Sequence, residues 1–142
     1  MSLTSTLPPI RLLITDREPA SREVLLSLFR AAPGFDSIKV VSPEEAIPQA
    51  ALDRVHVVLL DVVRPHEISV KVCQGLRALS PSPIVIALAT FADPKEEEAL
   101  RDAGAAGYLL KEVHLEKLVD AIHQIVAHER AALDRSSSSR QR

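Results

Sequence analysis

Two aspartates and a lysine, Asp16, Asp61 and Lys111, are the side chains best placed for chemistry in this sequence. Each directly follows a short and largely apolar run; the runs are Ile10–Thr15, Val55–Leu60 and Gly107–Leu110. Such runs are typical of strands buried on both faces of a parallel sheet, where ligand chemistry takes place just beyond the carboxyl ends of the strands. Because those ends share one edge, we expect the three side chains to face a single shallow cleft.

Two carboxylates and an ammonium group in one cleft would activate one aspartate as a nucleophile toward a phosphoryl group. A divalent ion held by the carboxylates would assist, because it neutralises charge on the phosphoryl oxygens. Asp61 lies where a functional carboxylate would be placed, although an aspartate at the end of a strand also commonly begins a turn. Ala89 follows another apolar run and is expected at the same edge.

Five apolar runs alternate along the chain with five segments of helical pattern. The expected strands span residues 10–15, 37–41, 55–61, 84–88 and 107–110. The expected helices begin at Pro19, Ser42, Val70, Asp93 and His114, and the last ends near Ala131. Pro48 is expected to break or kink the second helix, and residues 62–69 are expected to form a loop. Strict alternation of this kind predicts an α/β fold with a parallel sheet covered by helices on both faces.

The composition is that of an ordinary globular domain and narrows the function. The 142 residues are 46% hydrophobic and 25% charged, with a formal net charge of −2. This balance gives no electrostatic reason to expect nucleic acid or membrane as the main partner. None of the four glycines is spaced as in a phosphate-binding loop, which disfavours nucleotide-dependent enzymes. The single cysteine, Cys73, excludes an internal disulfide and fits a reducing cytoplasm.

The length predicts one domain, which we place at residues 10–131. Residues 1–9 are expected to be an N-terminal extension, and the Ser- and Arg-rich residues 132–142 a flexible tail or linker. No apolar run approaches the ~18 residues that a membrane span needs.

Four motifs give the chain a specific resemblance. They are Ile-Arg-Leu-Leu-Ile-Thr-Asp over residues 10–16, Val-Val-Leu-Leu-Asp over 57–61 with Arg64-Pro65, Leu-Ser-Pro over 79–81, and Ala-Gly-Ala-Ala-Gly-Tyr-Leu-Leu-Lys over 103–111. From about Ile10 to Val126 the chain resembles the receiver domain of bacterial two-component response regulators. It is most similar to the subfamily whose receiver precedes a helix-turn-helix DNA-binding domain. The resemblance implies a flavodoxin-like (βα)5 three-layer sandwich with strand order 2-1-3-4-5.

The resemblance also assigns roles to individual residues. It implies that Asp61 is the phosphoacceptor and that Lys111 contacts the phosphoryl group. It implies that Asp16, Asp61 and the backbone carbonyl of Val63 hold Mg²⁺, and that Tyr108 is the aromatic residue whose rotation reports phosphorylation. The partners implied are a histidine kinase or another signalling protein, and DNA only through an output domain that these residues do not contain.

Two positions depart from the family pattern. Arg17 replaces the second acidic residue, normally a direct Mg²⁺ ligand, and Ala89 replaces the Thr or Ser after the fourth strand. Thr90 is adjacent, but a shift of one residue turns a strand side chain to the opposite face. Exchanging an anion for a cation about 4 Å from the metal is worth several kcal/mol at an effective dielectric near 20. We therefore expect Arg17 to reach the carboxylates and weaken metal binding, with Glu18 the candidate to compensate.

Other reactive residue types fit structural roles. The five histidines lack the spacing of a zinc site and are expected to be solvated. Cys73 lies on an apolar helix stripe and is expected in the core. The acidic run from Glu96 to Glu98 is expected to be a solvated helix face.

These observations predict a cytoplasmic signalling domain rather than an enzyme. The leading hypothesis is a degenerate receiver that acts by protein–protein contact, with metal-dependent phosphorylation weakened or absent. The first alternative is a working Asp61 phosphoacceptor that takes phosphate from a histidine kinase. An alternative of another class is a stand-alone ligand-binding regulatory domain. We also expect a weak homodimer, formed either by the fourth helix, fifth strand and fifth helix or by the first and fifth helices.

Overall fold

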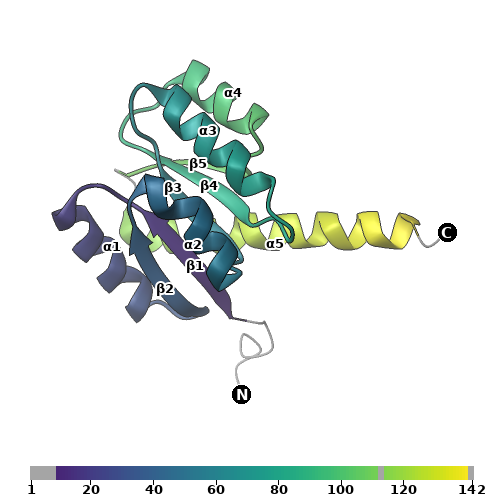
Figure 1. The fold of residues 1–142 in the computed structure, drawn as a ribbon. Helices are drawn as coiled ribbons and strands as arrows, with labels where there is room; N and C mark the ends of the chain where they lie inside the picture. The colour runs from purple at the N-terminus through teal and green to yellow at the C-terminus, as the bar shows by residue number, and fades with distance from the viewer. Residues whose placement is uncertain (1–8, 112–113, 141–142) are drawn as a thin grey trace.

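Five parallel strands form one sheet in the order β2-β1-β3-β4-β5 in a computed structural model that describes residues 9–111 and 114–140 (Figure 1). The strands are β1 (Ile10–Thr15), β2 (Phe35–Val41), β3 (Val57–Asp61), β4 (Ile84–Ala89) and β5 (Gly107–Leu110). The helices are α1 (Pro19–Ala31), the 3-10 helix η2 (Pro43–Glu45), α2 (Ala46–Asp53), α3 (His66–Arg77), α4 (Pro94–Asp102) and α5 (Leu115–Arg140). The predicted strand order is confirmed.

The sheet separates two hydrophobic cores, because successive strand residues point to opposite faces. Leu12 and Ile14 face one core, which α1 and α5 complete. Leu13 faces the other core, which α2, α3 and α4 complete and which contains the fully buried Cys73. All five residues of β3 are buried, as its uniform composition predicts. The result is the predicted flavodoxin-like three-layer sandwich (Figure 1).

The prediction for the second helix was wrong in detail. Pro48 neither breaks nor kinks α2, because it lies in the first turn, where a backbone N–H has no partner within the helix. The division falls earlier, between η2 and α2. The segment begins with a capping box in which Ser42 Oγ lies 2.7 Å from Glu45 Oε1.

The third helix begins earlier than the sequence predicts. Pro65 is the residue before the first helical position, with an extended backbone, and α3 starts at His66. Part of the predicted loop over residues 62–69 is therefore helical. A proline just ahead of a helix needs no hydrogen-bond partner for its nitrogen, so it does not prevent the helix from starting there.

The last helix continues past the predicted end. Residues 132–140, expected to be a flexible tail or linker, belong to α5. Adding a turn to an existing helix is easier than starting one, and Ala131, Ala132 and Leu133 are strong helix formers. α5 consequently extends well beyond the edge of the sheet (Figure 1).

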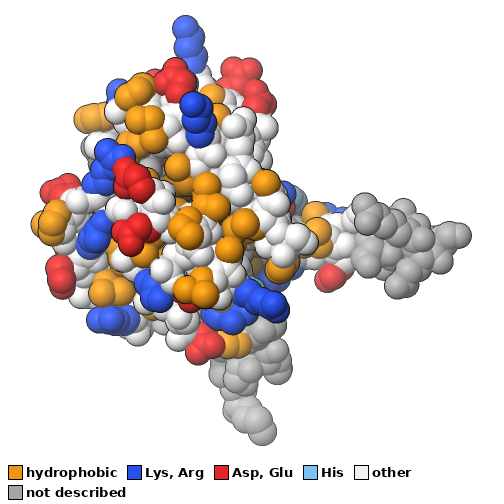
Figure 2. Space-filling model, viewed as in Figure 1, with side chains coloured by type: hydrophobic (Ala, Val, Ile, Leu, Met, Phe, Trp, Pro, Cys, Tyr) orange, Lys and Arg blue, Asp and Glu red, His pale blue; other side chains and the backbone are white. Residues whose placement is uncertain are grey.

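The surface carries interspersed charges of both signs on the face that Figure 2 shows. Hydrophobic side chains lie between them on this face. Among the described residues, the most exposed large hydrophobic residue is Leu52 on α2. No helix within residues 9–111 and 114–140 is both long enough and apolar enough to cross a membrane.

His56 ties the start of β3 to β1 through its ring. Its Nδ1 accepts a hydrogen bond from the backbone N–H of Arg11 at 3.0 Å, which requires that this nitrogen carry no proton. Burial, followed by the charges of Arg11 and Arg130, lowers the pKa of His56 below its ordinary 6.5.

We predict that acidification below pH 6.5 destabilises the domain through His56. Between the lowered pKa and 6.5 the unfolded chain binds more protons, so the free energy of unfolding falls as pH decreases. His56→Asn places an amide oxygen where Nδ1 was and should remove this contribution, measured by urea unfolding from pH 5 to 8. His128→Asn, at an exposed position on α5, should keep it. Equal pH dependence in both variants would contradict the prediction.

Candidate functional site

The carboxyl edge of the sheet brings Asp16 and Asp61 together. Asp16 directly follows β1, and its backbone N–H donates to the Val41 carbonyl at 3.0 Å. Asp61 is the last residue of β3, and its N–H donates to the hydroxyl of Thr15 at 3.1 Å. Thr15 is 1% exposed, so its hydroxyl fixes the neighbouring strand end from inside the protein.

Lys111 completes the cluster from β5. Its backbone N–H donates to the Ala89 carbonyl at 2.8 Å, which continues the pairing of β5 with β4. Its Nζ lies 2.7 Å from Asp61 Oδ1 and 3.9 Å from Asp16 Oδ2. The predicted convergence of these three residues at one edge is confirmed.

Both aspartates are buried, and burial is the largest influence on the pKa of Asp61. Asp16 is 1% exposed and Asp61 is 9% exposed. Burial raises the pKa of Asp61; the hydrogen bond and charge of Lys111 oppose this, and the charges of Asp16 and Glu18 add to it. The balance leaves the pKa of Asp61 above its ordinary value, so its charge is less favourable here than in water.

One oxygen of Asp16 lacks a hydrogen-bond partner. Oδ1 accepts from the Glu18 N–H at 2.9 Å, whereas Oδ2 is buried and has no partner among the described residues. Buried carboxylate oxygens are almost always satisfied, so this atom fits a site for a cation. Two carboxylates and a nearby backbone carbonyl are oxygen donors of the kind that Mg²⁺ prefers. Among residues 9–111 and 114–140, however, no group of three or more acidic, histidine or cysteine ligands occurs.

Arg17 does not occupy the site as the sequence predicts. Its Nη2 lies 2.6 Å from Glu44 Oε1, and both side chains are exposed. Within the described part of the chain, no ion pair joins Arg17 to Asp16 or Asp61. Arg17 lies two residues before the start of α1, and its side chain pairs with η2 instead of with the aspartates.

The loop after β3 is held by a buried serine. Ser69, in the first turn of α3, accepts from the Val63 N–H at 2.9 Å, and its Oγ lies 3.5 Å from the Val63 carbonyl oxygen. Its side chain is 1% exposed. Ser69 therefore contacts both backbone groups of Val63, the residue whose carbonyl is the expected third oxygen donor.

The residues expected to sense phosphorylation differ in their surroundings. Ala89 is 1% exposed and presents only a methyl group, while Thr90 is exposed, as the one-residue shift predicts. The hydroxyl of Tyr108 lies 3.1 Å from the Phe91 carbonyl and 3.3 Å from Glu96 Oε1. Glu96 is 2% exposed, so the prediction of a fully solvated acidic face was wrong at this position.

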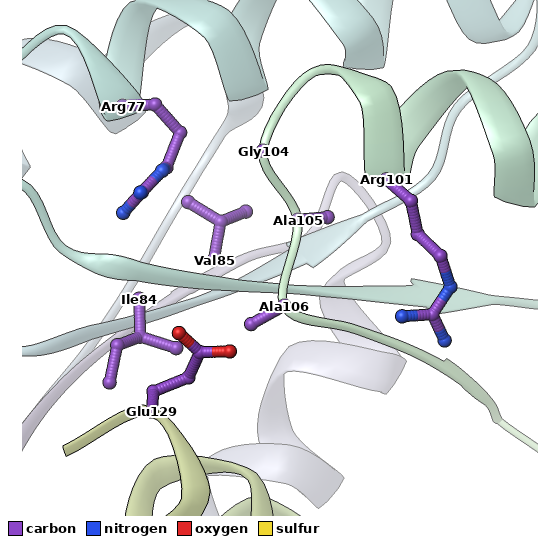
Figure 3. Close-up of a pocket in the computed structure, with 8 residues that line it drawn as sticks. All are labelled: Arg77, Ile84, Val85, Arg101, Gly104, Ala105, Ala106 and Glu129. Atoms are coloured by element: carbon purple, nitrogen blue, oxygen red, sulfur yellow. The ribbon is translucent and has the colours of Figure 1, made fainter. Parts of the chain in front are cut away.

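A separate hollow of about 150 Å³ lies at the amino ends of β4 and β5, away from the aspartates (Figure 3). Both arginines of its lining are already engaged: Arg77 donates to the Pro83 carbonyl at 3.0 Å and Arg101 pairs with Glu97 at 2.9 Å. Glu129 on α5 is the third charged residue of the lining. Pockets that bind small molecules commonly have volumes of about 300 Å³ or more. This hollow gives little support to a ligand-binding function.

The prediction of solvated histidines holds for His114 and His128, which are exposed, but not for His56 and His123. His123 stacks at 5.0 Å on Phe35, and its Nε2 lies 3.2 Å from the Pro33 carbonyl, so it packs α5 against the start of β2. His56 is half-buried, as described above.

Comparison with known proteins agrees with this geometry. The family model of the response regulator receiver domain matches residues 12–123. Response regulator MprA of Mycolicibacterium vanbaalenii is 33% identical over 114 residues, covering 78% of this chain and 48% of that protein. Transcriptional regulatory protein LnrK of Bacillus subtilis is 31% identical over 114 residues, covering 80% and 52%. The chain thus spans about half the length of these relatives.

Solved structures of receiver domains have a similar fold. The signal receiver domain of the putative response regulator NarL from Mycobacterium tuberculosis superposes with a TM-score of 0.77 at 20% identity, covering 85% of this chain and 98% of that one. The chain belongs to the response regulator receiver domain family.

Sequence reasoning missed four residues that shape this edge. Thr15 binds the backbone of Asp61, and Glu44 binds Arg17. Ser69 binds the backbone of Val63, and Glu96 contacts the hydroxyl of Tyr108. Thr15 could have been identified from the sequence, because it is a polar residue at the end of a largely apolar strand. The other three contacts join separate segments and leave no local pattern.

We predict that Asp61→Asn gains stability relative to the unmodified protein as pH rises. Because the folded pKa of Asp61 exceeds its ordinary 3.8, the folded chain binds more protons in that window, and this contribution to stability falls as pH increases. Urea unfolding at pH 3.5 and pH 7 measures the change.

Asp53→Asn is the matched control, because a hydrogen bond from Gln49 and then one from Lys39 lower the pKa of Asp53. This variant should lose relative stability over the same pH range. A difference between Asp61→Asn and the unmodified protein that is constant with pH would contradict the prediction.

Proposed function

We propose that this receiver domain acts mainly through protein–protein contact, with metal-dependent phosphorylation of Asp61 weakened. Receiver domains of response regulators are signalling domains of two-component systems, and this family generally binds Mg²⁺ at the phosphorylation site. The observation that carries the finer proposal is the donor set of the edge. It has two buried carboxylates, Asp16 and Asp61, where the family pattern has three.

The missing acid affects the metal directly. Asp16, Asp61 and the Val63 carbonyl would hold Mg²⁺, and the ion would supply counter-charge to the phosphoryl oxygens. Two carboxylates and the Lys111 ammonium sum to −1. A site of three carboxylates with one lysine sums to −2 and balances a divalent ion. The loss of one anionic ligand therefore weakens Mg²⁺ binding even though the Arg17 side chain lies outside the cluster.

The position after β4 weakens the response to phosphate. The Ala89 methyl group cannot donate a hydrogen bond to a phosphoryl oxygen, and Thr90 is exposed on the other side of the strand end. A phosphorylated Asp61 would lose one of the contacts by which the family registers phosphate.

A working phosphoacceptor is the second candidate, and two observations favour it. Arg17 is held by Glu44 outside the cluster, and the buried Asp16 Oδ2 has no hydrogen-bond partner among the described residues. In this alternative Asp61 receives phosphate from a histidine kinase, with Lys111 contacting the phosphoryl group. A stand-alone ligand-binding domain is the third alternative, and the hollow of Figure 3 is small for it.

The partner in the leading proposal is a histidine kinase or another signalling protein in the cytoplasm. Contact with DNA would pass through an output domain, as the family resemblance implies, since the domain itself carries no strongly basic composition.

We predict slow or absent labelling of Asp61 by acetyl phosphate with Mg²⁺, measured by mass spectrometry. Arg17→Asp should raise Mg²⁺ affinity by about tenfold or more, equivalent to roughly 1.4 kcal/mol, by restoring a third carboxylate. Ala89→Thr alone should leave Mg²⁺ affinity unchanged, because it adds no ligand to the metal.

Two control variants separate charge from ligation. Arg17→Asn removes the cation without adding a carboxylate and should recover only part of the affinity. Glu44→Gln releases Arg17 from its partner and should weaken Mg²⁺ binding further. Rapid, Mg²⁺-dependent labelling of the unmodified protein at Asp61 would overturn the leading proposal and establish the second candidate.

We predict a weak homodimer in sedimentation at high protein concentration. Val24 on α1 is 51% exposed, and Val24→Glu should weaken a dimer that uses α1 and α5. Lys95→Glu, at an exposed position on α4, should instead weaken a dimer through α4, β5 and α5. A protein that stays monomeric at every concentration contradicts both modes.

A further inference from the structure

Glu96 is a carboxylate inside the protein, on a helix whose other charged residues are exposed or half-buried. It is the third residue of α4, and its side chain is 2% exposed. A buried carboxylate is stable only when cations or hydrogen-bond donors compensate for the water it has lost. The groups that contact Glu96 are therefore tied to one another through it.

Each carboxylate oxygen of Glu96 contacts a different segment. Oε1 lies 3.3 Å from the Tyr108 hydroxyl on β5. Oε2 lies 3.5 Å from Nη2 of Arg64, in the loop between β3 and α3. Within the described part of the chain, Arg64 is the one cation that lies within 4.0 Å of this carboxylate.

Arg64 is held between two groups of the same region. Its guanidinium carbon lies 6.0 Å from the centre of the Phe91 ring, a geometry that favours a cation. Phe91 follows β4, and its carbonyl oxygen also accepts from the Tyr108 hydroxyl. Arg64 comes three residues after Asp61, so any movement of that loop moves the cation relative to Glu96.

Tyr108 experiences the charge of Glu96. Burial, and next the charge of Glu96, raise the pKa of Tyr108 above its ordinary value. Withdrawing Arg64 would leave the Glu96 charge less compensated, and the Tyr108 hydroxyl would become its main remaining donor.

We propose that Glu96 is a positioning residue that couples Arg64, on the loop after Asp61, to Tyr108 on β5. The link does not depend on Ala89 at the end of β4, which has no hydroxyl group to connect the loop with Tyr108. The inference goes beyond the proposed function, because it concerns contacts among the loop, α4 and β5 and requires neither a metal ion nor phosphate.

The intrinsic fluorescence of the protein tests the coupling. Tyr108 is the only tyrosine and the chain has no tryptophan, so tyrosine emission reports this position alone. An ionised carboxylate that accepts from a phenol quenches its emission. At pH 8, Glu96→Gln should therefore raise the emission. Arg64→Gln should lower it, because the uncompensated carboxylate is a stronger proton acceptor, and Arg64→Lys should restore it toward the original level.

A double-mutant cycle shows whether Arg64 acts through Glu96. In the Glu96→Gln background, Arg64→Gln should cause no further change in emission. Arg101→Gln and Glu97→Gln, which break the exposed ion pair on the same helix, should leave the emission unchanged. Circular dichroism of each variant checks that it is folded, and the high exposure of Arg64 favours folding of its variants.

The loop itself supplies an independent perturbation. Ser69→Ala releases the Val63 N–H and should alter Tyr108 emission in the unmodified background but not in Glu96→Gln. An equal effect of Arg64→Gln with and without Glu96, or a Ser69→Ala effect that persists in Glu96→Gln, would overturn the proposal. None of these measurements requires metal or phosphate, so failure of phosphorylation does not affect the outcome.

Discussion

Two aspartates are buried side by side at one edge of the sheet, and the ammonium group of Lys111 is what makes their burial tolerable. Asp16 and Asp61 repel each other in a region of low dielectric, and the 2.7 Å contact of Lys111 with Asp61 offsets part of that repulsion. Hydrogen bonds to neighbouring strands fix the backbone of Lys111 and of Asp61. Lys111 is paired with Ala89, and Asp61 is paired with the Thr15 hydroxyl. Displacing any one of these strands would leave a buried charge without compensation.

The replacement of an acid by Arg17 has a smaller electrostatic effect than the residue type suggests. Counted inside the cluster, Arg17 would bring the formal sum of Asp16, Asp61, Lys111 and Arg17 to zero. Paired with Glu44 it leaves the sum at −1, and the unpartnered Asp16 Oδ2 remains available to a cation. In the proposed function, a missing ligand rather than an added positive charge is what weakens Mg²⁺ binding.

The side of the domain formed by β4, α4 and β5 has its own buried charge. Glu96 connects α4 to the loop after β3 and to β5, so three segments of the carboxyl edge share one carboxylate. The same surface is one of the two candidate faces for a dimer. As proposed, contacts made on that face would act on the loop after Asp61 through Glu96 and Arg64.

The sequence by itself determined the alternation of strands and helices, the parallel sheet and the convergence of Asp16, Asp61 and Lys111, but not the limits of α2, α3 and α5. The features it determined depend on local patterns: largely apolar runs for β1, β3 and β5, helical stripes for the helices, and the rule that parallel strands end at one edge. The tertiary structure alone decided the partners of long charged side chains. Arg17 and Glu44 are 27 residues apart, and Arg64 pairs with Glu96 on another helix. Such side chains have several rotamers within reach of several partners, and only the packing of distant segments selects one.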